Sequence, residues 1–337
     1  MNKERDSYFD VVKAIAIFMV LLSHVIFYRA DFDLNVMPSY ILNFVMSINM
    51  PLFFIISGYF SQKLHTSSDY GSLKRRLLSY FYPFAVLSIA IAVFEGVVLG
   101  KYSLSAIPLW AIKKFLFSGW FFYALAGCDI ITYCACRFGK TVMLKFGIAL
   151  CCFIACMMLD GKVWYVGSIV SMIPFYWFGF GLLPKILNNK LVFAAMGLFG
   201  GVVLIFVTYF YGSIATNGLA FYWDRFDIYN PQKIKLFNML ARYVVGIVGS
   251  LFVCIIVRWT LDVIPIISKS SMLGLETLGI YLVQDAVIHY GANRFTTLES
   301  SSFELVLVAL GTLLVCFFIV RILKINQCMR RIIWRLC

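Results

Sequence analysis

Three ionisable residues lie in the first long apolar stretch, FDVVKAIAIFMVLLSH, which runs from residue 9 to residue 24: Asp10, Lys13 and His24. Charged groups inside a membrane segment are costly and are usually functional. On an α-helix, Lys13 and His24 would lie about 20° apart around the axis and roughly 16 Å apart along it. Asp10 would lie about 40° from His24 on the same side. The spacing therefore predicts one polar stripe, with a charge pair at one end and an imidazole at the other.

A histidine in this position is a candidate general base, because its ordinary pKa lies near neutrality and a buried imidazole tends to stay neutral. It could remove a proton from a hydroxyl group as that oxygen attacks a thioester. A cation nearer the cytoplasm could hold the phosphates of a donor with a long, thin arm, such as acyl-coenzyme A. Two structural alternatives remain open. Lys13 could snorkel to the interface with Asp10 as its i,i+3 partner, and His24 could be a hydrogen-bonded contact between helices.

The composition is that of a membrane protein. Of the 337 residues, 62% are hydrophobic and 13% are charged, whereas a soluble domain is about half apolar and about a quarter charged. The net charge of +13 comes from basic residues spread among short loops, so no nucleic-acid partner is expected. The ten cysteines include no CxxC pair, so they predict no metal site.

Apolar runs of the length needed to cross a bilayer, about 20 residues, predict an all-α polytopic protein with about ten transmembrane helices. Residues 1–337 would form a single integral-membrane domain. The Lys and Arg bias of the loops predicts that both termini are cytoplasmic. Residues 104–118 contain Lys113 and Lys114 and are expected to be interfacial. The predicted spans are 11–29, 40–61, 77–99, 119–137, 142–159, 163–184, 191–211, 240–258, 272–292 and 303–323.

Other polar residues near the apolar runs are candidates by default. His289, on the outer half of the ninth run, is a weaker second candidate for the base. The outer connection, residues 212–239, has aromatic rings beside Asp and Asn, which suits a carbohydrate face or an ordinary polar loop equally well. The remaining candidates are Glu95, Asp129, Arg242 and Glu276.

Five blocks of the sequence, in order along the chain, resemble those of the integral-membrane acyltransferase family 3. The first is the motif of the first span, a basic residue followed by an apolar–Asp pair, a second basic residue, ten positions and His. The other four lie in later spans and loops. The blocks are Arg5 with Phe9-Asp10, Lys13 and His24; NMPLFFIISGYF (49–60); LKRRLLSYFYPF (73–84), here a basic loop; GWFFYALAG (119–127); and TLGIYLVQ (277–284).

The resemblance implies an O-acyltransferase of the bacterial inner membrane. Such an enzyme moves an acyl group, usually acetyl, from cytoplasmic acetyl-CoA to a hydroxyl group of a surface glycan or lipid-linked sugar. Acetyl-CoA would be a co-substrate, with no bound cofactor. The resemblance would make His24 the catalytic residue and Lys13 its partner in the first-span motif, with Asp10 orienting Lys13 or the helix end. The donor phosphates would bind to Lys74, Arg75 and Arg76.

Two further residues could contact the donor. Ser57 could donate to the donor carbonyl, and Trp120 could line the donor pocket. The alternatives are plain helix packing for Ser57 and an interface anchor for Trp120.

The sequence departs from the family pattern at several positions. Lys13 stands where many members have Arg, which keeps the charge but loses the bidentate fork. Asn49 and Gln284 stand where members often have His, so the role of base rests on His24. The frequent Arg-x-x-Arg spacing is absent from the basic loop.

Two other classes of protein compete with the enzyme. A transporter or flippase of glycans or acyl carriers would use the same buried polar residues without chemistry, although no inverted repeat or broken helix pair is predicted. A membrane sensor or scaffold would be expected to carry a soluble output domain, and none is predicted.

Overall fold

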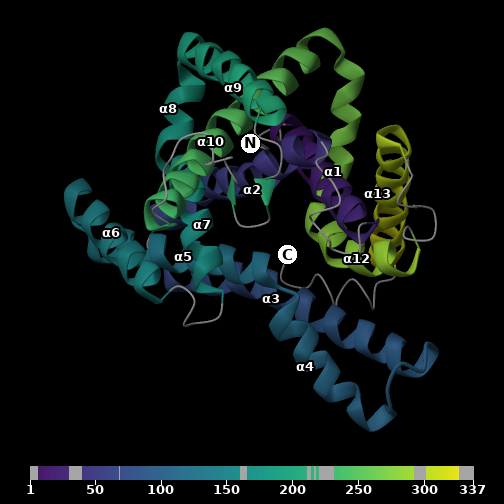
Figure 1. Cartoon of the computed structure of the whole chain (residues 1–337). Coiled ribbons are helices and arrows are strands. Elements are labelled where there is room, and N and C mark those ends of the chain that lie inside the picture. Colours follow the sequence, from purple (N-terminus) through teal and green to yellow (C-terminus); the bar gives the residue numbers. More distant parts are fainter. Residues whose placement is uncertain are drawn as a thin grey trace. The chain divides into compact units, whose positions relative to one another are not determined.

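The computed structural model describes residues 7–29, 40–67, 69–159, 165–210, 214–215, 218–219, 231–291 and 301–325, and they are helical almost throughout (Figure 1). The described strands, β1 (Ile214–Ala215) and β2 (Gly218–Leu219), form one short antiparallel pair with Ile214 opposite Leu219. The helices are α1 (Ser7–Arg29), α2 (Tyr40–Ser67), α3 (Tyr70–Val93), α4 (Ile107–Phe117), α5 (Trp120–Phe138), α6 (Val142–Leu159), α7 (Val166–Trp177), α8 (Leu183–Asn188), α9 (Lys190–Phe210), α10 (Pro231–Val263), α11 (Ser271–Leu275), α12 (Thr277–Tyr290) and α13 (Ser302–Ile325).

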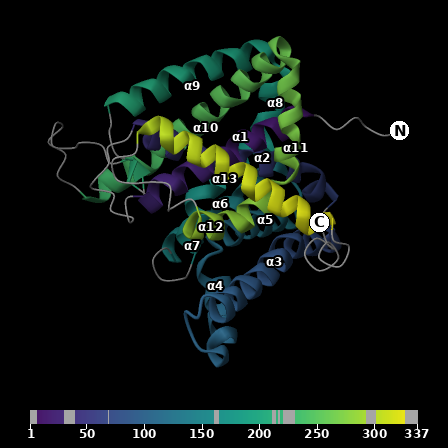
Figure 2. The same ribbon diagram turned by 90° about the vertical axis from the view of Figure 1, so that its right-hand side faces the viewer.

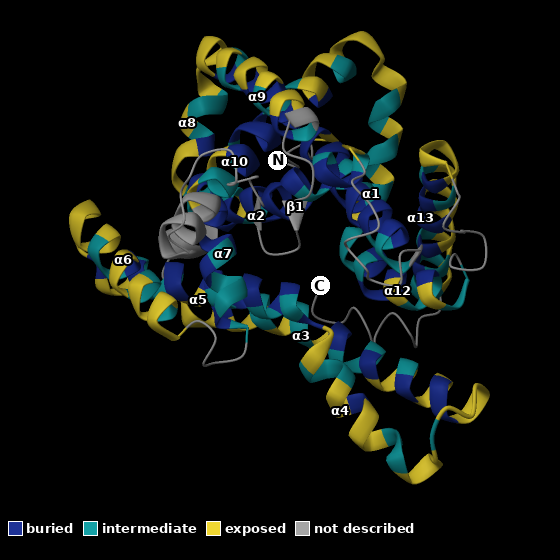
Figure 3. Ribbon diagram, viewed as in Figure 1, coloured by how far each residue is buried: buried dark blue, intermediate teal, exposed yellow. Residues whose placement is uncertain are grey.

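Nine helices of the described ranges are long and apolar enough to cross a membrane, or up to ten if a bent pair counts as one span. The prediction of an all-α polytopic membrane protein is therefore confirmed. Helix α6 illustrates the lipid-facing character of such helices, because only 6% of its apolar window is buried (Figure 3). The cytoplasmic position of both termini stays a prediction. At 11 residues, α4 is too short to be one of these spans.

The bent pair replaces the continuous span expected at 272–292. A 3₁₀ turn at Pro265–Ser270 leads into α11, and the segment Pro265–Leu275 meets α12 at an angle of 70°. The bend occurs at Glu276, whose φ of −102° and ψ of 6° end α11 before α12 begins. The hydropathy pattern did not predict this break, because both halves are apolar.

The chain divides into two compact units. The first comprises residues 1–59 and 175–317, and the second comprises residues 60–174 and 318–337. In the first unit, α1 packs against α10, α11 and α12, and α9 packs against α10 (Figures 1 and 2). Burial is deepest along α1, where Val12, Ile17 and Leu21 have no exposed surface.

Glycines bring two segments of the first unit into backbone contact. A Cβ atom at Gly58 of α2 would overlap with the carbonyl oxygen of Tyr176. A Cβ at Gly179, in the π-helical turn Phe178–Leu182, would overlap with the carbonyl oxygen of Ile55. Small residues permit this close approach of membrane helices, so α2 is held tightly at the end of its apolar run.

In the second unit, α3 packs against α4 and α5, and α5 packs against α6. Asp69 caps α3 by accepting hydrogen bonds from the backbone N–H groups of Gly71 (3.0 Å) and Ser72 (2.9 Å). The stretch predicted as a basic loop, Leu73–Phe84, is therefore part of a helix. The reason is the local cap, since an Asp at this position satisfies N–H groups that the first turn leaves without helical partners.

Candidate active site

The two halves of the broken span hold α1 along its length. Helix α11 lies against the start of α1, and a Cβ atom at Gly274 would overlap with the backbone carbonyl of Asp10. Helix α12 contacts the later part of α1. At the opposite side, the Tyr8 hydroxyl donates to the backbone oxygen of Cys254 in α10 at 2.9 Å. These contacts fix α1, which carries the residues of the first-span motif.

Asp10 and Lys13 form an ion pair of 2.5 Å one helical turn apart. Asp10 is buried and Lys13 is partly exposed. The i,i+3 pairing that the sequence allowed is therefore present. A second carboxyl group, that of Glu276, is buried at the break between α11 and α12.

His24 lies deeper along α1 and is half-buried. Its charged neighbour is Asp285 of α12, whose carboxylate acts electrostatically on the imidazole. The Tyr28 hydroxyl, one turn after His24, donates a hydrogen bond of 2.5 Å to Oδ1 of the same carboxylate. Asp285 was not singled out from the sequence. The signal was its position, an acidic residue inside an apolar run, directly after the block TLGIYLVQ.

The second histidine candidate lies at the same pair of helices. His289 follows Asp285 by one turn of α12, and its ring centre is 5.8 Å from that of Tyr28. We refer to His24, Tyr28, Asp285 and His289 as the α1–α12 polar cluster. It contains two imidazoles, a carboxylate and a phenol on two facing helices, and imidazole is the side chain that most often transfers protons in catalysis.

Asn49 and Gln284, at the positions where the family often has His, are both buried. The side-chain nitrogen of Asn49 lies 3.4 Å from the hydroxyl oxygen of Ser23, the residue before His24. The amide oxygen of Gln284 has no hydrogen-bond partner among the described residues. A buried acceptor without a partner calls for an explanation, and a hydroxyl group of a bound ligand would supply the missing donor.

The basic residues at the start of α3 divide into two kinds. Lys74 and Arg75 are exposed, and Arg75 contacts Ser72 at 3.1 Å. The ion pair of Arg75 with Asp69 is long, at 3.9 Å. Hydrogen bonds from the Ser72 hydroxyl and the Gly71 backbone lower the pKa of Asp69, so this carboxyl group stays ionised. Lys74 and Arg75 thus present their charges to solvent.

Arg76 differs because its guanidinium is bound inside the second unit. Its Nε donates to Oδ2 of Asp129 at 2.9 Å and to the Tyr80 hydroxyl at 2.6 Å. Tyr80 in turn donates to Asp129 at 3.1 Å. Asp129 is fully buried and the side chain of Arg76 is 18% exposed. Arg76 therefore serves the packing of α3 on α5, and this explains the buried Asp129 as well.

The other two residues expected to contact the donor, Ser57 and Trp120, are distant in the sequence from the residues of the polar cluster. Ser57 is half-buried in α2, beside the close backbone contact at Gly58. Trp120 begins α5 in the second unit, and its ring packs edge-on against Phe121 at 6.4 Å. Most of the outer connection at 212–239, with its aromatic and acidic residues, lies outside the described residues.

Comparison with known proteins gives one match. The model of an acyltransferase domain family, the one expected from the five sequence blocks, matches residues 6–321. No curated protein and no solved structure matches the chain.

Proposed function

The chain belongs to the integral-membrane acyltransferase family 3, and from this premise we propose that it O-acetylates a glycan. The donor is cytoplasmic acetyl-CoA and the acceptor is a hydroxyl group of a bacterial surface glycan or its lipid-linked precursor, at the inner membrane. The observation that carries this proposal is the α1–α12 polar cluster, because it puts a carboxylate beside the histidine of the first-span motif.

In the proposed reaction, His24 takes the proton of the acceptor hydroxyl while that oxygen attacks the thioester carbonyl carbon. The carbon–oxygen bond forms, the carbon–sulfur bond breaks, and the leaving thiolate takes the proton back from the imidazolium. Asp285 stabilises the imidazolium as it forms through its negative charge, as a carboxylate does for a catalytic histidine elsewhere. Tyr28 holds Asp285 in place, and the Gln284 amide oxygen accepts a hydrogen bond from the sugar.

The donor phosphates would bind to exposed cations. Lys74 and Arg75 supply exposed charge at the start of α3. Lys13 of α1, which is partly exposed and paired with Asp10, is a separate candidate for a phosphate contact. Arg76 is left out of this site because Asp129 holds it. Ser57 and Trp120 remain candidates for contacts with the thioester carbonyl and the pantetheine arm.

A second candidate function, transport of a glycan or acyl carrier, is favoured by the break between α11 and α12. Discontinuous membrane helices often form substrate sites in transporters, and the 70° bend at Glu276 is one such break. A transporter would need the polar cluster as a pathway and would leave acetyl-CoA intact.

One experiment separates the two functions. Purified protein in lipid nanodiscs is given acetyl-CoA labelled in the acetyl group together with an isolated surface glycan, and label on the glycan is measured. We expect transfer by the native protein and a loss of about 10²- to 10⁴-fold for His24→Ala, the range for a general base. His289→Ala is the matched control, since it removes a histidine from the same cluster.

Two outcomes would contradict the proposal. Absence of labelled glycan with the native protein would remove the enzymatic function. Full transfer by His24→Ala with loss in His289→Ala would move the role of base to the other histidine. Gel filtration of both variants checks that they fold and insert.

A further inference from the structure

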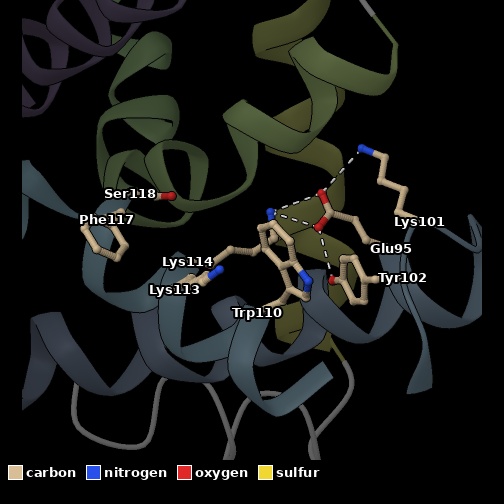
Figure 4. Close-up of a pocket in the computed structure, with 8 residues that line it drawn as sticks. All are labelled: Glu95, Lys101, Tyr102, Trp110, Lys113, Lys114, Phe117 and Ser118. Atoms are coloured by element: carbon tan, nitrogen blue, oxygen red, sulfur yellow. Dashed lines mark hydrogen bonds and ion pairs between the residues drawn. The ribbon is translucent and has the colours of Figure 1, made fainter. Parts of the chain in front are cut away.

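A cavity outside the polar cluster lies in the second unit, between α4 and the end of α3 (Figure 4). Its volume is about 590 Å³, within the range of roughly 300–1,000 Å³ that is typical of small-molecule sites. The π-helical turn Phe94–Val98, which follows α3, contributes its buried carboxylate. The lining residues are Glu95, Lys101, Tyr102, Trp110, Lys113, Lys114, Phe117 and Ser118.

Positive charge exceeds negative charge in this cavity. Glu95 is its one carboxylate among the lining residues, and Lys114 binds it at 3.0 Å while Lys101 lies at 3.8 Å. No dashed line joins Lys113 to that carboxylate in Figure 4. Its Nζ lies 4.7 Å from the centre of the Trp110 ring, and no carboxylate of the described residues pairs with it. Lys113 therefore offers an ammonium group that is available to an anion.

The wall beside Lys113 is aromatic and fixed. Tyr102 and Trp110 stack with ring centres 5.2 Å apart and planes at 15°. The Tyr102 hydroxyl donates to the backbone oxygen of Ala92 at 2.7 Å and to Glu95 at 3.3 Å. Burial and the neighbouring Glu95 raise the pKa of Tyr102, so the phenol stays protonated as a donor. Trp110 lines the cavity and remains 38% exposed.

The cavity lies at the opposite end of α3 from Lys74 and Arg75. The helix rises about 1.5 Å per residue, so Glu95 is roughly 30 Å from Arg75 along the axis. This matches the hydrocarbon thickness of a bilayer, roughly 30 Å. If Lys74 and Arg75 face the acetyl-CoA compartment, the cavity opens at the other surface, where the proposed acceptor is found.

We propose that this cavity, here named the α3–α4 pocket, binds an anionic sugar residue of the acceptor glycan. The anion, a carboxylate or phosphate on the sugar, pairs with Lys113, and the CH face of the same ring packs against Trp110. The Ser118 hydroxyl and the Glu95 carboxylate at the pocket wall can bond sugar hydroxyl groups. This inference rests on the proposed function and narrows the acceptor to an acidic glycan.

A lipid phosphate could use the same ammonium group, but the geometry favours the sugar. A headgroup at the bilayer surface needs an exposed cation alone, whereas the α3–α4 pocket adds a concave volume, a fixed aromatic wall and two polar side chains. Aromatic rings beside hydroxyl-bonding groups match both faces of a sugar ring, its CH patches and its hydroxyl groups.

The test measures binding directly. Protein in nanodiscs of neutral phosphatidylcholine is titrated with a tetramer of galacturonic acid and with its carboxyl-reduced, neutral counterpart. We expect the acidic tetramer to bind at least fivefold more tightly than the neutral one. Lys113→Gln should weaken binding of the acidic tetramer at least fivefold. Trp110→Leu should also weaken binding of the acidic tetramer. Lys140→Gln is the matched control, because Lys140 is an exposed lysine of the same unit that does not line the pocket, and its loss should leave binding within twofold.

The results distinguish a site for an acidic sugar from a site for a lipid phosphate. Equal affinity for the two tetramers, or no effect of Lys113→Gln, overturns the inference. Binding of anionic-lipid vesicles that depends on Lys113, without binding of the tetramer, overturns it in favour of a lipid site. His24→Ala should bind the tetramer normally. Tetramer binding without acetyl transfer to any glycan would refute the proposed enzymatic function and leave the sugar site in place. Acetyl transfer together with unaltered tetramer binding by Lys113→Gln would refute the sugar site and leave the enzymatic function in place.

Discussion

The hydroxyl of Tyr28 donates a 2.5 Å hydrogen bond to Oδ1 of Asp285 and so joins the first helix of the chain to α12. Tyr28 stands one turn after His24, and the same carboxylate is the charged neighbour of that histidine. A carboxylate held from one side by a phenol has a restricted orientation towards the imidazole. The Tyr28–Asp285 contact therefore holds a negative charge on α12 near His24, and the proposed role of His24 as a base depends on that charge.

Asp285→Asn should lower kcat of acetyl transfer by about 10²-fold or more, because the amide no longer stabilises the imidazolium. KM for acetyl-CoA should change less than twofold, since Asp285 is proposed to act through His24. Tyr28→Phe should lower kcat about tenfold, because it removes one hydrogen bond to a charged group. Steady-state kinetics on labelled acetyl-CoA give both constants. Asp285→Glu should recover part of the rate, and an unaltered kcat in Asp285→Asn would refute the role.

Reversing the charge of Lys74 and Arg75 together should raise the acetyl-CoA concentration at half-saturation by at least about tenfold, because even one charge-assisted phosphate contact is worth roughly 1.5–3 kcal/mol. The matched control is Arg137→Glu with Lys140→Glu, which makes the same change in net charge at exposed residues of the same unit. A similar rise in this control would mean that general electrostatics, and not a phosphate site, sets donor affinity.

Arg76→Met should destabilise the protein by about 3–5 kcal/mol, because it leaves the buried carboxylate of Asp129 without its cation. The double variant Arg76→Met with Asp129→Leu should recover most of that loss, since it removes both charges. Thermal unfolding in detergent measures both effects. Half-saturation by acetyl-CoA should be unaltered in the double variant, and a large rise there would return Arg76 to the donor site.

Gly58→Ala should prevent the correct packing of α2, because the added Cβ atom would overlap with the carbonyl oxygen of Tyr176. We expect little folded protein in gel filtration. Gly181→Ala is the control, since a Cβ at Gly181 meets no atom within 4 Å. Equal yields of folded protein from the two variants would show that the backbone contact at Gly58 can relax at little cost.

The features that were predicted correctly from the sequence are those that depend on its local pattern. Apolar run length marks where a helix can cross the bilayer, so the all-α polytopic class was predicted correctly. The i,i+3 spacing of Asp10 and Lys13 likewise predicted their ion pair, because neighbours on one helix are fixed by its periodicity. The five ordered blocks identified the family that the comparison then matched.

Pairings between distant segments were decided only by the tertiary structure. Asp285 could not be assigned to His24, nor Asp129 to Arg76, because hydropathy says which residues cross the membrane but not which faces of two helices meet. The break at Glu276 was missed for a related reason, since the segments on both sides of it are apolar and together pass as one span by hydropathy. The sequence by itself determined the helical membrane class, the family and the first-helix motif, whereas the packing of α12 on α1 decided which carboxylate lies near the histidine.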